Sequence, residues 1–199
     1  WLASWMILGL PTQIAMANPA PGATALPNGE SVAAGSVGNF NRSIANELHL
    51  EDVANGTIIN WNNFDIGSDA WTEFQQLGGT TSAVLNRVGD GNVTGIMGKL
   101  TANGRVFVIN PAGILFGGGS QVSVAQLVAS SLGISNTDFL AGNMIFQGGG
   151  GIVEVENLAT INATDSVYLI GGDVLQHGTI NVPNGDVVLV ANVDDKVTI

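Results

Sequence analysis

The chain has 199 residues and a formal net charge of −11, and only 11% of its residues are charged. Its five basic residues are too few for a nucleic-acid surface, which needs clustered Lys and Arg, and the acidity disfavours docking on anionic lipid. Cysteine is absent, so there is no disulfide framework and no thiolate metal site. The 28 glycines and many neutral polar residues suit strands and tight turns better than helices.

Residues 1–17 are predicted to be part of a secretory signal peptide. The apolar run from Leu2 to Leu10 is too short to cross a bilayer, which takes about 20 residues, and fits the hydrophobic stretch of a signal. Ala15 and Ala17 follow with the small-x-small spacing of a cleavage site, so cleavage is expected after Ala17. No positively charged start precedes the run, so the chain is expected to begin inside the signal. The alternative is a buried core segment.

A leader at residues 18–30 is expected to have little regular structure, and residues 31–199 are expected to form one β domain. Short, β-branched runs bounded by Gly, Asn, Asp or Pro predict its strands. One segment, Val124 to Leu132, has apolar residues at helical spacing and is predicted to be a short helix. Representative strand runs are Thr57–Asn60, Val106–Ile109, Val167–Ile170 and Val187–Val190.

The C-terminal part of the sequence repeats with a period near 20 residues. Thr160–Asn162 recurs as Thr179–Asn181, and Ser166–Ile170 corresponds to Asp186–Val190. A short period with two or three strands indicates a solenoid of stacked coils, with roughly nine turns over this length. The repeat runs to the end of the sequence, so the domain is expected to be cut from a longer solenoid.

Two features of such a solenoid can be anticipated. Asn162 and Asn181 would lie one above the other and could hydrogen-bond as a ladder, or could serve ordinary turn chemistry. An open strand edge invites aggregation, so the N-terminal end needs a cap. The irregular region from Ser31 to Trp71 is the candidate, with four aromatic residues that could plug the core: Phe40, Trp61, Phe64 and Trp71.

Six further blocks occur in a fixed order: Ile59–Gly67, Val84–Val88, Ile96–Leu100, Asn103–Gly117, Val128–Leu132 and Asp138–Asn143. Together they resemble the secretion (TPS) domain of two-partner secretion exoproteins, the filamentous-haemagglutinin-like family. The resemblance covers about residues 30 to 199, and its most specific block is the one from Asn103 to Gly117.

The resemblance implies an all-β fold, a right-handed parallel β-helix with an N-terminal cap and extra-helical strands or hairpins. It implies Sec-dependent export to the periplasm and recognition of the unfolded chain by an outer-membrane Omp85-type transporter with periplasmic domains. The domain would then fold at the bacterial cell surface, or as a secreted protein, and template the β-helix of a large adhesin-like exoprotein. Any host-cell or carbohydrate receptor would be bound by downstream regions.

The resemblance also assigns candidate secretion motifs. The family's Asn-Pro-Asn-Gly turn corresponds to Asn110, Pro111, Ala112 and Gly113, and its second motif corresponds to Asn86 and Arg87. These residues would act in transporter recognition directly or through folding. On purely structural grounds, Pro111 would fix φ and Gly113 would supply a positive φ in a tight turn.

A catalytic function is not expected, and neither is a cofactor. His49 and His177 have no obvious carboxylate partner, so no triad is indicated. Glu154 and Glu156 would share one face of a strand, and paired carboxylates on a β-helix suggest the rival reading, a free-standing carbohydrate-binding or polysaccharide-cleaving protein. Clustered Asp with Lys or Arg in a longitudinal groove would favour that rival, whereas rows of neutral polar residues would favour a secretion domain.

Overall fold

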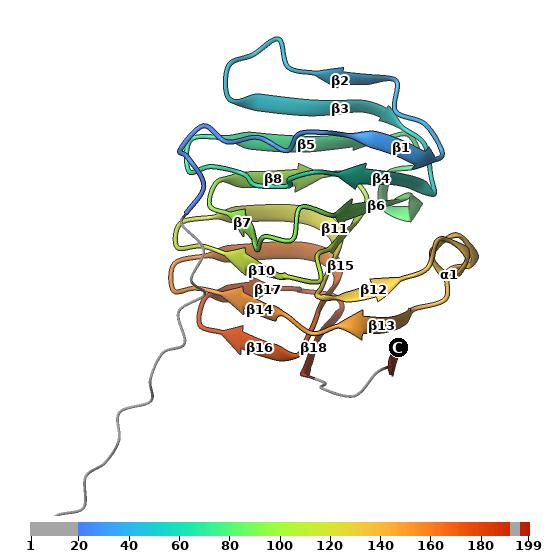
Figure 1. Cartoon of the computed structure of the whole chain (residues 1–199), viewed down its shortest axis with the longest axis vertical. Coiled ribbons are helices and arrows are strands. Elements are labelled where there is room, and N and C mark those ends of the chain that lie inside the picture. Colours follow the sequence, from blue (N-terminus) through green and yellow to red (C-terminus); the bar gives the residue numbers. More distant parts are fainter. Residues whose placement is uncertain (1–19, 192–195) are drawn as a thin grey trace, which may run out of the picture.

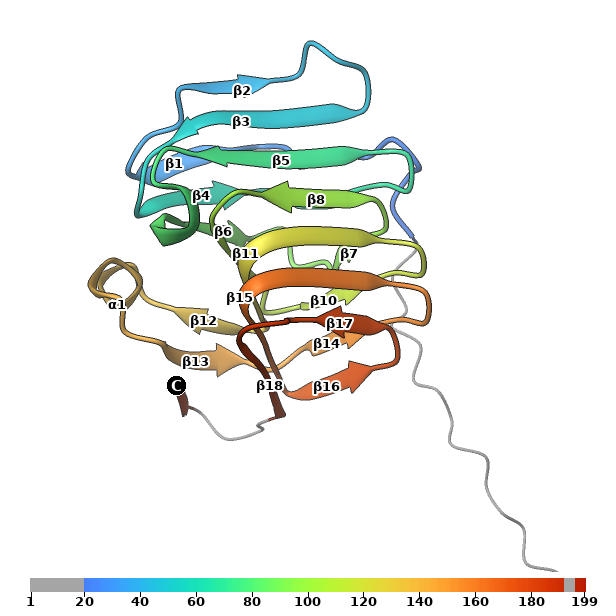
Figure 2. The same ribbon diagram turned by 180° about the vertical axis from the view of Figure 1, so that it is seen from behind.

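The computed structural model describes residues 20–191 and 196–199, which form a column of stacked strands (Figure 1). The predicted cleavage site at Ala15 and Ala17 lies outside the described residues. The strands run as a right-handed parallel β-helix with three faces, viewed from opposite sides in Figures 1 and 2. No helix in the described part of the chain is long and apolar enough to cross a membrane.

The first and second faces each contain six consecutive parallel strands, and the long strands β11 and β15 turn the corner between them. The first face is β3 (Glu47–Val53), β5 (Trp71–Gln76), β8 (Lys99–Ala102), β11 (Gln121–Ser130), β15 (Thr160–Gly171) and β17 (Thr179–Asn181). The second face is β4 (Thr57–Trp61), β6 (Ala83–Val88), β9 (Arg105–Ile109), β11, β15 and β18 (Asp186–Ala191).

The third face is a shorter parallel sheet of β7 (Thr94–Ile96), β10 (Gly113–Phe116), β14 (Ile152–Val155) and β16 (Asp173–Gln176). The estimate of nine turns was wrong, because only the C-terminal coils keep the period of about 20 residues. The cap, a 3-10 turn at Gly79–Thr81 and a long extra-helical excursion take up the remaining length.

The sequence repeat corresponds to the register of the C-terminal coils. Thr160 pairs with Thr179, and Ser166 pairs with Asp186, so each repeated residue lies over its counterpart. Asn181 Nδ2 donates to Asn162 Oδ1 at 2.9 Å, which confirms the predicted asparagine ladder.

The helix predicted from Val124 to Leu132 was wrong, since most of this segment lies in β11. Its apolar spacing reflects burial on both sides of the strand, against the core and against the extra-helical strands. The described helix is α1 (Asn136–Ala141), where the Ser135 side chain accepts from the Asp138 amide and Gly142 ends the helix in a left-handed conformation.

The N-terminal cap consists of two antiparallel strands. β1 (Ser31–Ala34) pairs with β4, and β2 (Asn39–Asn41) pairs with β3. Three of the four predicted aromatic residues close the core in a chain of edge and stacked contacts: Phe40 to Trp61 at 6.0 Å and Trp61 to Phe64 at 5.5 Å between ring centroids. Trp71 does not belong to the plug, because it points outward from the first face beside His49.

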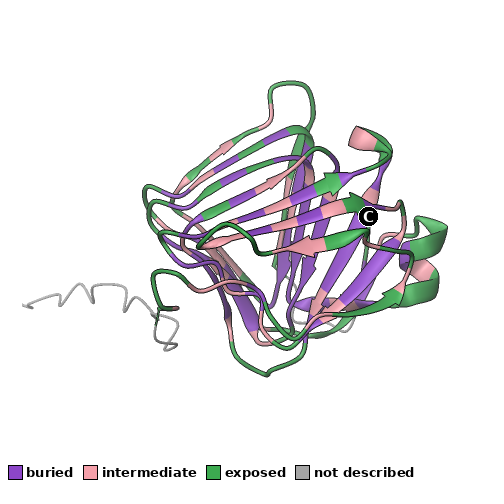
Figure 3. Ribbon diagram, turned by 90° about the horizontal axis from the view of Figure 1, so that it is seen from above, coloured by how far each residue is buried: buried purple, intermediate pink, exposed green. Residues whose placement is uncertain are grey.

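An extra-helical layer covers the second face. It contains β12 (Leu132–Ile134), α1, β13 (Ile145–Gly149) and β19 (Lys196–Thr198), and it forms a second apolar cluster around Phe107, Phe139 and Phe146. Seen from above, strands of the first face alternate between buried and less buried residues, whereas β4, β6 and β9 of the second face are buried almost continuously (Figure 3). The second face is therefore sandwiched, and the outward side of the first face is not.

The leader is docked on the β-helix. Gly67 N donates to Ala25 O and Asp69 N donates to Ala23 O, both close to 2.9 Å. Leu26 packs against the core, and Asn28 forms an isolated antiparallel bridge with Asn63. The described part of the leader, residues 20–30, has little regular structure but a fixed path along the coil.

Candidate functional site: the secretion motifs and the outward face

Asn110 lies directly after β9 and is 1% exposed. Its Nδ2 donates to Asn92 O at 2.8 Å and to Thr94 Oγ1 at 2.9 Å, and its Oδ1 accepts from Ala112 N at 3.0 Å. The side chain thus closes an Asx turn at one end and ties that turn to the preceding coil at the other.

The rest of this motif forms the predicted tight turn. Gly113 N donates to Asn110 O at 2.9 Å, and Gly113 has a φ of 120°, which favours glycine. Pro111 is exposed and Ala112 is half-buried. In the folded domain a partner could therefore reach Pro111, whereas the amide of Asn110 is already occupied.

Asn86 points into the core from β6 and is fully buried. Its Oδ1 accepts from Trp61 Nε1 at 3.0 Å, and its Nδ2 donates to Phe107 O at 3.1 Å. The amide therefore provides hydrogen-bond partners for two buried polar groups, the indole N–H of Trp61 beneath the cap and the Phe107 carbonyl of the next coil.

Arg87, the neighbour of Asn86, points outward toward the extra-helical layer. Its guanidinium donates to Ile134 O at 2.8 Å and to Asn60 Oδ1 at 3.4 Å. Burial lowers the pKa of Arg87 below its usual range. The two motifs occupy neighbouring strands, but no described contact joins the side chains of Asn86 and Asn110. Each motif secures a different junction of the fold.

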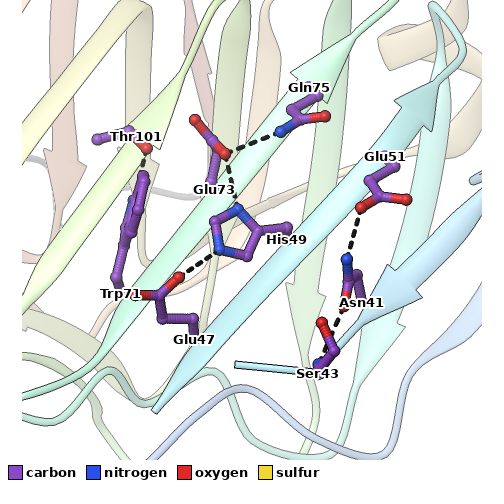
Figure 4. A network of polar contacts seen from close by, with 9 residues as sticks. All are labelled: Asn41, Ser43, Glu47, His49, Glu51, Trp71, Glu73, Gln75 and Thr101. Atoms are coloured by element: carbon purple, nitrogen blue, oxygen red, sulfur yellow. Dashed lines mark hydrogen bonds and ion pairs between the residues drawn. The ribbon is translucent and has the colours of Figure 1, made fainter. Parts of the chain in front are cut away.

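A polar cluster that the sequence reasoning missed lies on the first face (Figure 4). His49 Nε2 is 2.7 Å from Glu47 Oε2, and His49 Nδ1 is 2.7 Å from Glu73 Oε2, so the expectation that His49 lacks carboxylate partners was wrong. Burial alone would lower the pKa of His49, but hydrogen bonds to the two carboxylates and their charges raise it above 6.5. The alternation of Glu47, His49 and Glu51 along one strand was an available signal.

Trp71 and Lys99 continue this cluster toward the C-terminal coils. Trp71 Nε1 donates to Thr101 Oγ1 at 2.7 Å, and the Lys99 ammonium lies 4.0 Å from the centre of the Trp71 ring. The indole is therefore fixed in orientation, and it holds the ammonium in turn by a cation–π contact.

Glu154 and Glu156 lie close together at the third face, but as half-buried groups rather than on a solvated surface. Burial and the charge of Glu156 raise the pKa of Glu154, and the charge of His177 opposes them. Glu156 Oε2 accepts from Gly118 N at 2.8 Å, which holds the glycine loop after β10. Among the described contacts, no Lys or Arg pairs with either carboxylate.

Two outward rows run along the first face. One row is Glu47, Trp71, Lys99, Gln121, Thr160 and Thr179, and the other is His49, Glu73, Thr101, Ser123, Asn162 and Asn181. From β8 onward the rows contain neutral polar residues apart from Lys99, without clustered Asp. This pattern is the one anticipated for a secretion domain rather than for a polysaccharide-cleaving enzyme.

A capped β-helix with an extra-helical layer and Asn-based turns defines the class of two-partner secretion domains. The TPS secretion domain family matches residues 23–198, and the chain belongs to this family. The chain is 34% identical over 172 residues to a heme/hemopexin-binding protein of Haemophilus influenzae, covering 80% of this chain and 18% of that protein. A second protein of that description, also from Haemophilus influenzae, is 34% identical over 90 residues.

A solved structure of another secretion domain has a similar fold. The HMW1 secretion domain from Haemophilus influenzae superposes with a TM-score of 0.76 at 32% identity, covering 86% of this chain and 46% of that one. The aligned part of the chain spans about a fifth of the length of the first of these relatives, so it corresponds to one region of a much longer protein.

Proposed function

We propose that this domain directs secretion by presenting its motifs to an outer-membrane Omp85-type transporter while the chain is still unfolded. The observation that carries the proposal is the burial of Asn86 and Asn110, whose side-chain amides are hydrogen-bonded inside the folded domain. A transporter can bind these amides only before the domain folds. After translocation the same amides form hydrogen bonds within the domain. Folding therefore buries the groups that the transporter recognises and opposes return of the chain through the transporter.

Residues 1–17, with cleavage after Ala17, are proposed to deliver the chain to the Sec machinery, and residues 18–30 then dock as the leader. The chain would pass through the periplasm to the cell surface or the medium. Support comes from the family, whose exoproteins work with a cognate transporter. The domain is proposed to act in transport without catalysing a reaction, as part of a large adhesin-like exoprotein whose receptors are bound elsewhere.

The C-terminal end of the column supports a role in templating. Val187 and Leu189 of β18 occupy core-facing positions in register with the buried residues Val167 and Leu169, yet they are 45% and 46% exposed. Complete burial of such a side chain from full exposure is favourable by roughly 1.5–3 kcal/mol, and about half of that remains to be gained at each of these half-exposed positions. We propose that the next coil of the exoprotein folds onto this end.

The test is a secretion assay of the chain with a complete Sec signal, with and without its cognate transporter. Asn110→Ala is compared with Asn162→Ala, which removes an exposed amide, and with Leu169→Ala, a core variant that does not touch either motif. Unfolding free energies of all three are measured in parallel. Release of the parent chain only in the presence of the transporter supports the proposal. Equal release with and without the transporter contradicts it.

The variants separate recognition from folding. If Asn110→Ala is released less well than a core variant of equal stability, the amide is recognised directly by the transporter. If release simply follows the unfolding free energy across the three variants, the motif acts through folding alone. The proposal that the transporter recognises the amide directly would then be wrong.

A further inference from the structure

The first face is the one face of the described β-helix whose outward side remains uncovered along its length (Figure 2). The extra-helical layer packs on the second face, and on the third face Pro21 of the leader lies against Gly95. A depression of about 290 Å³ opens on the first face over β8, β11 and β15. Its lining is Lys99, Thr101, Gln121, Val122, Ser123, Thr160 and Asn162.

The depression offers unused hydrogen-bonding groups. Among the described residues, no protein partner is recorded for the side chains of Gln121, Ser123 and Thr160, while Asn162 uses only its Oδ1, toward Asn181. Thr101 accepts from Trp71, so its hydroxyl proton is available for an acceptor. Hydroxyls and amides therefore line the floor on two parallel rows, spaced by the distance of about 4.8 Å between strands.

Lys99 supplies a positioned charge at one end of the depression. Among the described residues, no carboxylate lies within ion-pair distance of Lys99, whereas Arg42 pairs with Glu30 and Arg87 donates to Ile134. Its described contact is the Trp71 ring, which is itself fixed by Thr101 and by the edge of His49. An ammonium held this way can attract an anionic group locally, while the net charge of −11 opposes anion binding by the chain as a whole.

The chemistry of the depression narrows the ligand class. Peptide addition to the sheet is excluded here, because β8, β11 and β15 already pair on both sides. A divalent cation would need carboxylates, and none lines the depression. An inorganic anion would need several positive donors, whereas Lys99 is the single charged group.

We propose that this depression binds an acidic saccharide, with the carboxylate on Lys99 and the sugar hydroxyls on Thr101, Gln121, Ser123, Thr160 and Asn162. The site is shallow and open, so the dissociation constant is expected in the high micromolar to millimolar range. The binding is non-catalytic and is additional to the secretion function, so it can be tested on the folded chain without a transporter.

The experiment is an NMR titration of the purified chain with sialyllactose and with trigalacturonic acid, which distinguish a sialic from a uronic acid. Lactose and maltotriose are the corresponding uncharged control sugars. The expected result is a saturable amide shift confined to β8, β11 and β15 for at least one acidic probe, weakened by added salt. Absence of shifts there at roughly tens of millimolar probe, or equal binding of the uncharged sugars, overturns the proposal.

Variants locate the charge contact. Lys99→Met should weaken binding of the acidic probe roughly fivefold, the effect of an exposed ion pair, and Gln121→Ala should weaken it as well. Lys196→Met is the matched control, since it removes the same charge from β19 in the extra-helical layer. Equal weakening by Lys99→Met and Lys196→Met would mean that only net charge matters, and the site would be refuted. Thermal unfolding of each variant verifies that it is folded.

Discussion

The indole nitrogen of Trp61 donates to the amide oxygen of Asn86 across a distance of 3.0 Å, inside the core beneath the N-terminal cap. Trp61 is 2% exposed and Asn86 is fully buried. A cap aromatic is thereby joined to a residue of a candidate secretion motif 25 positions later in the chain. This hydrogen bond links the closed end of the β-helix to the side-chain amide of the motif.

Asn86→Ala should lower the free energy of unfolding by about 1–3 kcal/mol, because it leaves the Trp61 N–H and the Phe107 carbonyl unpaired in the core. Urea denaturation measures this loss. In a Trp61→Phe background the indole N–H is already absent, so the same substitution should cost less. An equal cost in both backgrounds would show that the indole hydrogen bond contributes nothing.

Arg87→Met should loosen the extra-helical layer without unfolding the β-helix. The substitution keeps an unbranched stem but removes the hydrogen bond to Ile134 O, the described link from the motif to β12. We expect a stability loss of about 1 kcal/mol and faster amide exchange in β12 and β13. Hydrogen–deuterium exchange provides the measurement. Lys99→Met, which removes a charge far from β12, should leave that exchange unchanged, and matching profiles for the two variants would contradict the anchoring role.

Gly67→Ala should detach the leader. A Cβ at this position would collide with the backbone carbonyl oxygens of Gly22 and Ala23, and neither can yield without breaking the docking hydrogen bonds. Limited proteolysis should then cleave within residues 21–28, while the β-helix core stays resistant. Gly89→Ala is the control, since the nearest atom to its added Cβ is 3.9 Å away. A leader that stays protected in Gly67→Ala would contradict the docked path.

The stacking register of the C-terminal coils was predictable because the sequence of one coil repeats in the next. Thr160 and Thr179 occupy equivalent positions in two copies, so stacking them required no knowledge of the rest of the chain. The turn at Gly113 was predictable for a local reason, since its neighbours define a tight turn that needs a positive φ. The cap was expected from the open strand edge as well as from the family resemblance, and the extra-helical strands were expected from the resemblance alone.

The remaining features depend on contacts between distant segments. Glu73 reaches His49 across 24 positions, a separation set by the length of the first coil rather than by any repeat. The segment from Val124 was misassigned because a strand buried on both sides lacks alternation, so its apolar residues imitate a helix. Helix α1 was missed although its signals were present, with Ser135 at the start and Gly142 at the end.

The His49 cluster should make stability depend on pH. A neutral imidazole has one N–H, whereas both ring nitrogens lie 2.7 Å from a carboxylate, so the doubly protonated ring fits this site. The folded-state pKa is raised above 6.5, so the cluster stabilises the protein fully below pH 6.5 and loses this contribution as pH rises through the folded-state pKa.

Unfolding free energies measured between about pH 6 and pH 9 test this dependence, because this range begins below the usual histidine pKa of about 6.5 and extends well above it. The parent chain should exceed His49→Gln in stability at the acidic end, and the two should converge at the alkaline end. Glu73→Gln serves as a control, because it removes one of the two carboxylates and should shrink the pH-dependent difference. A constant gap between the parent chain and His49→Gln across this range would show that the ring does not titrate there, and that β3 is held to β5 by packing and backbone pairing alone.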